Sequence, residues 1–105
     1  MKKSKSEIKS LIKLNILKTD PNAEIILFGS QARGDENKYS DWDLLILTNH
    51  PNSFKDEQKI MDNLYELELE LEEVFSPLIY SMIEWKTKYP ITPLYENVLM
   101  EGIVL

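Results

Sequence analysis

Two continuous apolar runs constrain the fold of this chain more than any other feature. They are "EIILF" (24–28) and "DLLIL" (43–47), and neither alternates between polar and apolar positions. Such runs are typical of strands covered on both faces, whereas a half-exposed strand alternates with period two. The sequence therefore predicts two central strands of a small sheet with further elements packed against both of its faces.

Two segments with helical periodicity lie on either side of these runs. Apolar side chains recur at the spacing of one helix face in residues 6–18, and Asp20 with the following proline ends that pattern. Ser53 is a good N-cap for a second helix that ends near residue 73. The segment "YELELELEE" (65–73) also alternates as a strand would, but its continuity with the capped pattern favours the helix.

The last third of the chain supplies one more strand and one more helix. "FSPLIYS" (75–81) is interpreted as a strand, and Pro77 places it at an edge or at a break in pairing because proline donates no ladder hydrogen bond. Thr92 is predicted to cap a final helix at about 93–101, which Gly102 stops. The expected fold is α/β (α+β-like), a small mixed sheet of about three strands flanked by helices.

Length and composition narrow the class of protein. A chain of 105 residues holds one modest core, so we expect a single domain over residues 1–105. It has no cysteine, which fits a reducing cytoplasm, and no apolar run long enough to span a bilayer. Its formal charge of −6 opposes general binding to nucleic acid. We expect a cytoplasmic protein that associates with neither a membrane nor nucleic acid.

The charge is nevertheless unevenly distributed. The first 18 residues carry about +5 and the remainder about −11. Six lysines produce the positive end: Lys2, Lys3, Lys5, Lys9, Lys13 and Lys18. We interpret them as a solvated helix face, and the alternative is a strip that binds RNA or a partner protein. RNA binding by this strip predicts a steep dependence on salt concentration.

Asp41 and Asp43 stand at the start of the second apolar run. Alternate residues of a strand project from the same face with Cα atoms about 6–7 Å apart, so both carboxylates can reach one site. Their mutual repulsion would be relieved by a hard divalent cation with oxygen ligands, Mg²⁺ above all. The alternative is that both are merely solvated at a turn and a strand start. Trp42 projects from the opposite face and is expected in the core.

A glycine-containing turn follows the first apolar run. Gly29 permits positive φ or a close backbone approach, and Ser30 can present its hydroxyl and amide where a short helix begins near Gln31. These features predict a phosphate cradle, with an ordinary turn as the alternative. Arg33 is the only arginine in the chain, and it either holds a triphosphate or pins the loop through Asp35 or a carbonyl.

The glycine turn and the aspartate pair together form a composite motif. It comprises Gly-Ser-Gln-Ala-Arg-Gly at 29–34 and Ser-Asp-Trp-Asp-Leu-Leu at 40–45. This arrangement resembles the minimal nucleotidyltransferases of the DNA polymerase β superfamily, whose pattern is Gly-Ser-x-x-Arg-Gly followed by Ser-Asp-x-Asp-Leu. The resemblance is sharpest over residues 24–47 and extends more loosely to the ending "TPLYENVLMEGIVL".

The resemblance implies a polymerase β-like nucleotidyltransferase fold and a set of site residues. Mg²⁺ would be held by Asp41 and Asp43 as catalytic residues, and the nucleotide by Gly29, Ser30 and Arg33. The implied reaction transfers a nucleoside monophosphate, AMP from ATP in the first instance, to a hydroxyl acceptor and releases pyrophosphate. Small members of this family are often antitoxins paired with a HEPN-type toxin, and some attach AMP to it. The resemblance thus implies a toxin–antitoxin system in which the toxin is the partner.

One position departs from the pattern of the resembled family. The full site of that family has a third carboxylate on the next strand, and in "FSPLIYS" Ser76 takes its place. Serine is neither a strong general base nor a negatively charged metal ligand. Glu73 could substitute only if the end of its helix points inward. The alternative function is therefore a catalytically weakened antitoxin that binds and masks its toxin.

Other candidate residues have structural interpretations. His50, the only histidine, is expected in an exposed loop rather than as a ligand. Trp85, Tyr89 and Tyr95 are expected to pack around helices, with stacking on an adenine or a partner as the alternative.

Overall fold

The computed structural model describes residues 3–51 and 53–105, so Lys2 lies outside the described part. The first helix, α1, spans Lys5–Thr19 and agrees with the helix predicted over 6–18. Ser4 and Glu7 form a capping box at its start, in which each side chain accepts from the other residue's backbone N–H. The buried face of α1 repeats every four residues and consists of Ile8, Ile12 and Ile16.

The sheet contains four strands rather than the three that were predicted. They are β1 (Glu24–Phe28), β2 (Trp42–Thr48), β3 (Phe75–Ser81) and β4 (Ile103–Val104), arranged in the order β3-β2-β1-β4. β1 is antiparallel to both β2 and β4, whereas β2 and β3 are parallel. The mixed sheet and the edge position of the strand that contains Pro77 were predicted correctly.

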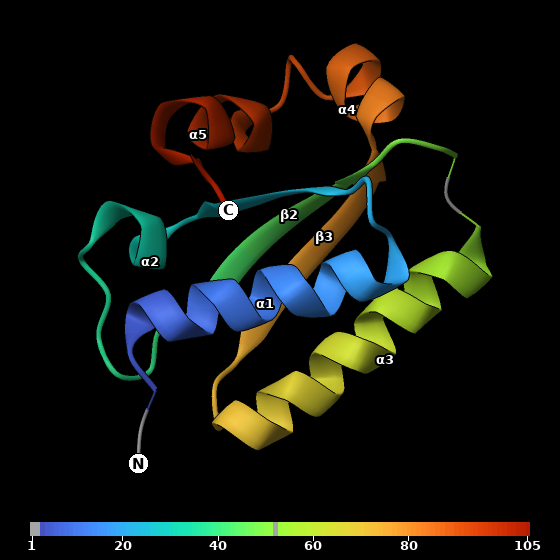
Figure 1. Ribbon diagram of the computed structural model, residues 1–105. Coiled ribbons are helices and arrows are strands. Elements are labelled where there is room, and N and C mark those ends of the chain that lie inside the picture. The colour runs from blue at the N-terminus through green and yellow to red at the C-terminus, as the bar shows by residue number, and fades with distance from the viewer. Residues whose placement is uncertain (1–2, 52) are drawn as a thin grey trace.

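Helices cover both faces of the sheet (Figure 1). α1 and α3 (Phe54–Leu71) lie side by side on one face, and α4 (Met82–Lys88) and α5 (Pro93–Glu101) lie on the other. The acidic stretch over 65–71 is helical, as the capped pattern before it indicated. α4 was not predicted; Ser81 caps it by accepting a hydrogen bond from the backbone N–H of Glu84.

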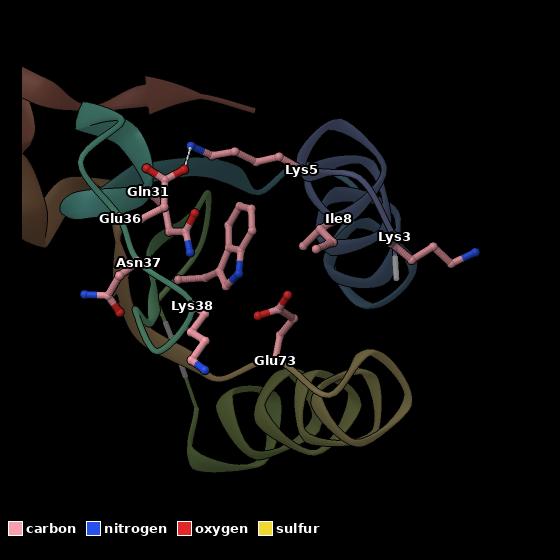
Figure 2. A pocket seen from close by; sticks show the side chains of 9 residues that line it. Lys3, Lys5, Ile8, Gln31, Glu36, Asn37, Lys38 and Glu73 are labelled. Carbon is pink, nitrogen blue, oxygen red and sulfur yellow. Dashed lines mark hydrogen bonds and ion pairs between the residues drawn. The ribbon is translucent and has the colours of Figure 1, made fainter. Parts of the chain in front are cut away.

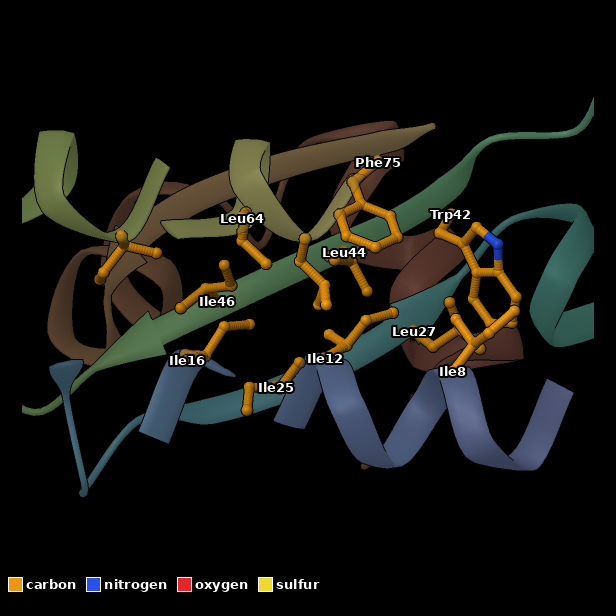
Figure 3. Packing of buried hydrophobic residues seen from close by; sticks show 12 residues of the cluster. Ile8, Ile12, Ile16, Ile25, Leu27, Trp42, Leu44, Ile46, Leu64 and Phe75 are labelled. Carbon is orange, nitrogen blue, oxygen red and sulfur yellow. The ribbon is translucent and has the colours of Figure 1, made fainter. Parts of the chain in front are cut away.

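The strand residues divide between two apolar clusters according to the face from which they project. Trp42, Leu44 and Ile46 pack with α1 and α3, as Figure 3 shows, whereas Leu45 and Leu47 pack with α4 and α5. Because both faces of β2 are buried, its sequence shows no period-two alternation. Successive side chains of β2 nevertheless project to opposite faces, so Asp43 lies on the α5 side. Trp42 is buried on the other face, which confirms that it belongs to the core.

No helix within residues 3–51 and 53–105 is both long and apolar enough to cross a bilayer. Of the lysines in α1 that were interpreted as a solvated face, Lys13 and Lys18 are exposed, and Lys5 forms an ion pair with Glu36.

Candidate functional site

The turn after β1 requires glycine for its backbone conformation and for the space that it leaves. Gly29 has φ 74° and ψ −160°, a combination that residues with a Cβ avoid. Its carbonyl accepts hydrogen bonds from the N–H groups of Ala32 and Arg33, which starts the four-residue helix α2 (Ser30–Arg33). Gly34 ends α2 in the left-handed conformation at φ 86°. The turn is therefore set by two glycines in conformations that other residues rarely adopt.

The carboxylate of Asp43 lies directly against this turn. A Cβ built on Gly29 would be 2.1 Å from Asp43 Oδ2 and 3.0 Å from its Cγ. Phe28, the residue before Gly29, is the register partner of Asp43 across β1 and β2. The antiparallel pairing thus brings the turn and the acidic strand start together, although 14 positions separate them in the sequence.

Asp41 and Ser76 are the next two residues of the acidic group that contains Asp43. Ser76 Oγ donates a hydrogen bond to Asp41 Oδ2 over 2.9 Å. Ser76 is also the register partner of Asp43 in the parallel pair β2 and β3. The position predicted for a third carboxylate therefore lies beside both aspartates and holds a serine hydroxyl.

Burial and repulsion disfavour a second negative charge at this point. The pKa of Asp43 is raised from its ordinary value, first by burial and then by the charge of Asp41, while Arg33 opposes the shift. Carboxylate oxygens are hard ligands, and a divalent cation such as Mg²⁺ would relieve the repulsion between the two aspartates. Asp41 and Asp43 therefore fit such an ion. Within residues 3–51 and 53–105, however, no cluster of three or more Asp, Glu, His or Cys side chains could hold a metal.

Arg33 is engaged by two carboxylates. Its Nε donates to Asp35 Oδ2 over 3.1 Å, and its Nη1 donates to the two oxygens of Glu101 over 3.2 and 3.0 Å. Of the two roles considered for Arg33, this arrangement favours pinning of the loop. Glu101 was not among the residues predicted from the sequence, where its only local signal is its place as the acid before the glycine that ends α5.

Glu73 does not supply the missing carboxylate. It lines a pocket of about 240 Å³ together with Ile8, Gln31 and Trp42, on the side of the sheet covered by α1. Figure 2 shows the Glu73 side chain directed into this pocket. Asp43 projects from the opposite side of β2, where it pairs with Ser76, so Glu73 does not replace the carboxylate missing at Ser76.

The remaining aromatic candidates pack on one another. Trp85 stacks on Tyr80 and Tyr89 with ring centroids 6.1 and 5.8 Å apart, and its ring centroid lies 4.9 Å from that of Tyr95. These rings form the cluster between the sheet, α4 and α5, which agrees with the packing interpretation. His50 lies in the exposed loop after β2, as expected, and pairs with Asp20.

Comparison with known proteins bears directly on the composite motif. The sequence profile of the nucleotidyltransferase domain family matches residues 8–105. The chain belongs to this family. A protein of Methanocaldococcus jannaschii provisionally named a protein adenylyltransferase is 36% identical over 80 residues, which are 76% of this chain and 75% of the relative. The nucleotidyltransferase was thus correctly recognised from its turn and its aspartate pair.

Solved structures share the fold of this nucleotidyltransferase. A structure provisionally described as a minimal nucleotidyltransferase superposes with a TM-score of 0.65 at 21% identity, over 98% of this chain and 97% of that one. A chain from a complex of tri-AMPylated Shewanella oneidensis HEPN toxin with its MNT antitoxin gives 0.62 at 17% identity, over 96% and 71%. A chain of a toxin–antitoxin complex with AMP-PNP gives 0.61 at 19% identity, over 97% and 72%.

Proposed function

We propose that this nucleotidyltransferase transfers AMP from ATP, with Mg²⁺, to a hydroxyl group on a partner protein. The observation that carries the proposal is the contact between the two halves of the motif, in which the Asp43 carboxylate fills the space that a side chain on residue 29 would need. A nucleotide whose phosphates lie along the turn would meet Asp41 and Asp43 at its reacting end. The aspartates would then act on the group that is transferred.

Each residue of the site has a defined part in this reaction. Gly29 and Ser30 would bind phosphate oxygens, Arg33 would keep the loop in place, and Asp41 and Asp43 would hold Mg²⁺. When bound, the ion neutralises phosphate charge and polarises the phosphoryl group. The acceptor oxygen bonds to the α-phosphorus while the bond from that phosphorus to the bridging oxygen breaks, and pyrophosphate leaves. The hydroxyl proton passes to a base on the partner or to solvent, because Ser76 is not a base of useful strength.

The names of the similar proteins support a protein acceptor. The relative from M. jannaschii is named for adenylyl transfer to protein, and one solved complex contains an AMPylated HEPN toxin. By analogy we place this chain as the antitoxin of such a pair, with the toxin as acceptor. A cytoplasmic location follows from the same role.

The decisive experiment is transfer of label from ATP to a co-expressed HEPN-type toxin in the presence of Mg²⁺. Wild type should label the toxin, and Asp43→Asn should reduce labelling by about 10² or more because an ion ligand is lost. Asp62→Asn, an identical change on the exposed surface of α3, is the matched control and should label normally. Full labelling by Asp43→Asn would overturn the proposal.

A second candidate function is specifically favoured by Ser76. If the chain neutralises its toxin by masking it, complex formation and neutralisation should survive the double change Asp41→Asn and Asp43→Asn. If transfer is the mechanism, neutralisation should be lost together with nucleotide transfer even where the complex still forms. Size-exclusion chromatography of the mixture and a growth assay with the toxin separate the two.

A further inference from the structure

Glu101 connects both ends of the glycine turn to the last helix of the chain. Its Oε1 accepts a hydrogen bond from the backbone N–H of Gly29 over 3.0 Å. The same carboxylate receives Arg33 Nη1 on both oxygens, at 3.2 and 3.0 Å. Gly29 precedes α2 and Arg33 ends it, so one side chain from a distant part of the sequence fixes the entrance and the exit of the turn.

The end of α5 is packed so that Glu101 has little freedom. A Cβ on Gly102 would lie 2.8 Å from Ile26 Cγ2, so the backbone here is packed against β1, and 2.4 Å from the carbonyl oxygen of Val98 in α5 itself. Ile103 then pairs with Leu27 at once. The side chain of Glu101 is 20% exposed, compared with 46% for that of Arg33. The packing of the helix end, rather than solvent, therefore determines where this carboxylate lies.

Electrostatics indicate what this contact does for the site. Arg33 and Glu101 both lie close enough to Asp43 for their charges to act on it. A guanidinium without its Glu101 partner would remain near Asp43 and would compete with a metal ion for the charge of that carboxylate. Holding Arg33 on Glu101 keeps Asp43 available.

We propose that Glu101 is a positioning residue of the nucleotide site, acting through the Gly29 amide and through Arg33 rather than by touching the nucleotide. This inference rests on the proposed function, since it concerns the same site. It assigns nucleotide affinity, more than the rate of the chemical step, to a contact between the end of α5 and the turn after β1.

The proposal is tested by calorimetry, which measures how tightly the full chain binds a non-hydrolysable ATP analogue in the presence of Mg²⁺. Glu101→Ala should weaken binding by about tenfold or more, whereas kcat at saturating ATP should change by less than about threefold. Glu96→Ala, the same change at an exposed acid on the same helix, is the matched control and should change neither value. Equal affinities of Glu101→Ala and Glu96→Ala would overturn the proposal.

Two further variants separate the two connections that Glu101 makes. In an Arg33→Ala background, the remaining cost of Glu101→Gln should be small, because glutamine can still accept from the Gly29 amide and the guanidinium is gone. Full additivity of the two changes would show that Glu101 does not act through Arg33.

Hydrogen exchange of the Gly29 amide distinguishes failure of this inference from failure of the proposed function. Exchange should be faster in Glu101→Ala than in wild type, and Glu101→Gln should restore protection. If wild type binds no nucleotide, the proposed function fails. The exchange rate then still tests whether Glu101 holds the Gly29 amide in place. Equal exchange in wild type and Glu101→Ala would overturn it.

Discussion

The hydroxyl of Ser76 donates to Asp41 Oδ2 over 2.9 Å, from the position on β3 that pairs with Asp43. A carboxylate at this position would add a third negative oxygen donor to the two aspartates and a base for the acceptor hydroxyl. We therefore expect Ser76→Asp to raise the rate of Mg²⁺-dependent transfer by about tenfold or more, given that general bases typically contribute 10²–10⁴. Initial rates with labelled ATP and the partner protein measure this.

Ser76→Asp also has a predicted cost. Three carboxylates repel without a cation, so the variant should melt below wild type in EDTA and regain stability when Mg²⁺ is added. Ser76→Asn, similar in size but uncharged, should show neither the rate increase nor the loss of stability in EDTA, and Mg²⁺ should stabilise it only as much as it stabilises wild type. Equal rates for the aspartate and asparagine variants would mean that position 76 does not face the reacting groups.

Mg²⁺ alone should stabilise the wild-type fold through Asp41 and Asp43. A ligand at ten times its dissociation constant stabilises the folded state by about 1.4 kcal/mol, which raises the melting temperature by several degrees for a domain of this size. Asp43→Asn should abolish this response, and Asp62→Asn should retain it. Melting curves followed by circular dichroism at increasing Mg²⁺ provide the measurement, and an unchanged response in Asp43→Asn would contradict the proposed ligand.

The elements that were predicted correctly are those specified by local patterns. The continuous apolar runs around Leu27 and Leu45 identified the central strands because both faces are covered, and the cap at Ser53 settled an ambiguous acidic segment as helix. Pro77 indicated an edge strand because it lacks a donor, which is a local property. Period-two geometry likewise placed Trp42 in the core.

Two of the parts that were missed, β4 and Glu101, depend on contacts between distant residues. β4 is only two residues long and exists because Ile103 meets Leu27, so no pattern in its own sequence announces it. Glu101 lies 68 positions from Arg33 and 72 from Gly29, and an acid at a helix end has many other uses. The motif therefore identified the family, whereas finding the carboxylate that bonds to both ends of its turn required the tertiary structure.

Gly29 should tolerate alanine much less well than Gly34. Both residues have positive φ, which costs a residue with a Cβ about 1 kcal/mol or more. A Cβ at Gly34 would meet nothing within 4 Å, but at Gly29 it would lie 2.1 Å from Asp43 Oδ2. Gly34→Ala therefore isolates the cost of the left-handed conformation, and Gly29→Ala should exceed it in urea unfolding by about 1–3 kcal/mol, because alanine adopts the Gly29 conformation less readily and its Cβ would overlap Asp43. In an Asp43→Ala background the excess should shrink, and an unchanged excess would place the strain elsewhere.

The ion pair between His50 and Asp20 should make stability depend on pH near neutrality. The Nε2 atom of His50 lies 3.2 Å from Asp20 Oδ2, and the Nδ1 atom of His50 lies 3.1 Å from the carbonyl oxygen of Pro51. The pKa of His50 is raised from its ordinary value of 6.5, first by that carbonyl and then by the charge of Asp20. A raised histidine pKa stabilises the fold fully below the unfolded value and loses that contribution as pH rises through the folded value.

Wild type should therefore lose melting temperature between about pH 6 and pH 8, because protonated His50 joins the loop after β2 to the end of α1. His50→Gln removes the titrating group, and Asp20→Asn removes the charge while keeping an oxygen that can accept from the Asn22 amide as Asp20 does now. His50→Gln should flatten this part of the stability profile, and Asp20→Asn should only reduce its slope, because the Pro51 carbonyl still raises the pKa of His50. Thermal melts in buffers of constant ionic strength measure both effects. The chain contains no other histidine. If the slope persists unchanged in His50→Gln, a group other than histidine causes it.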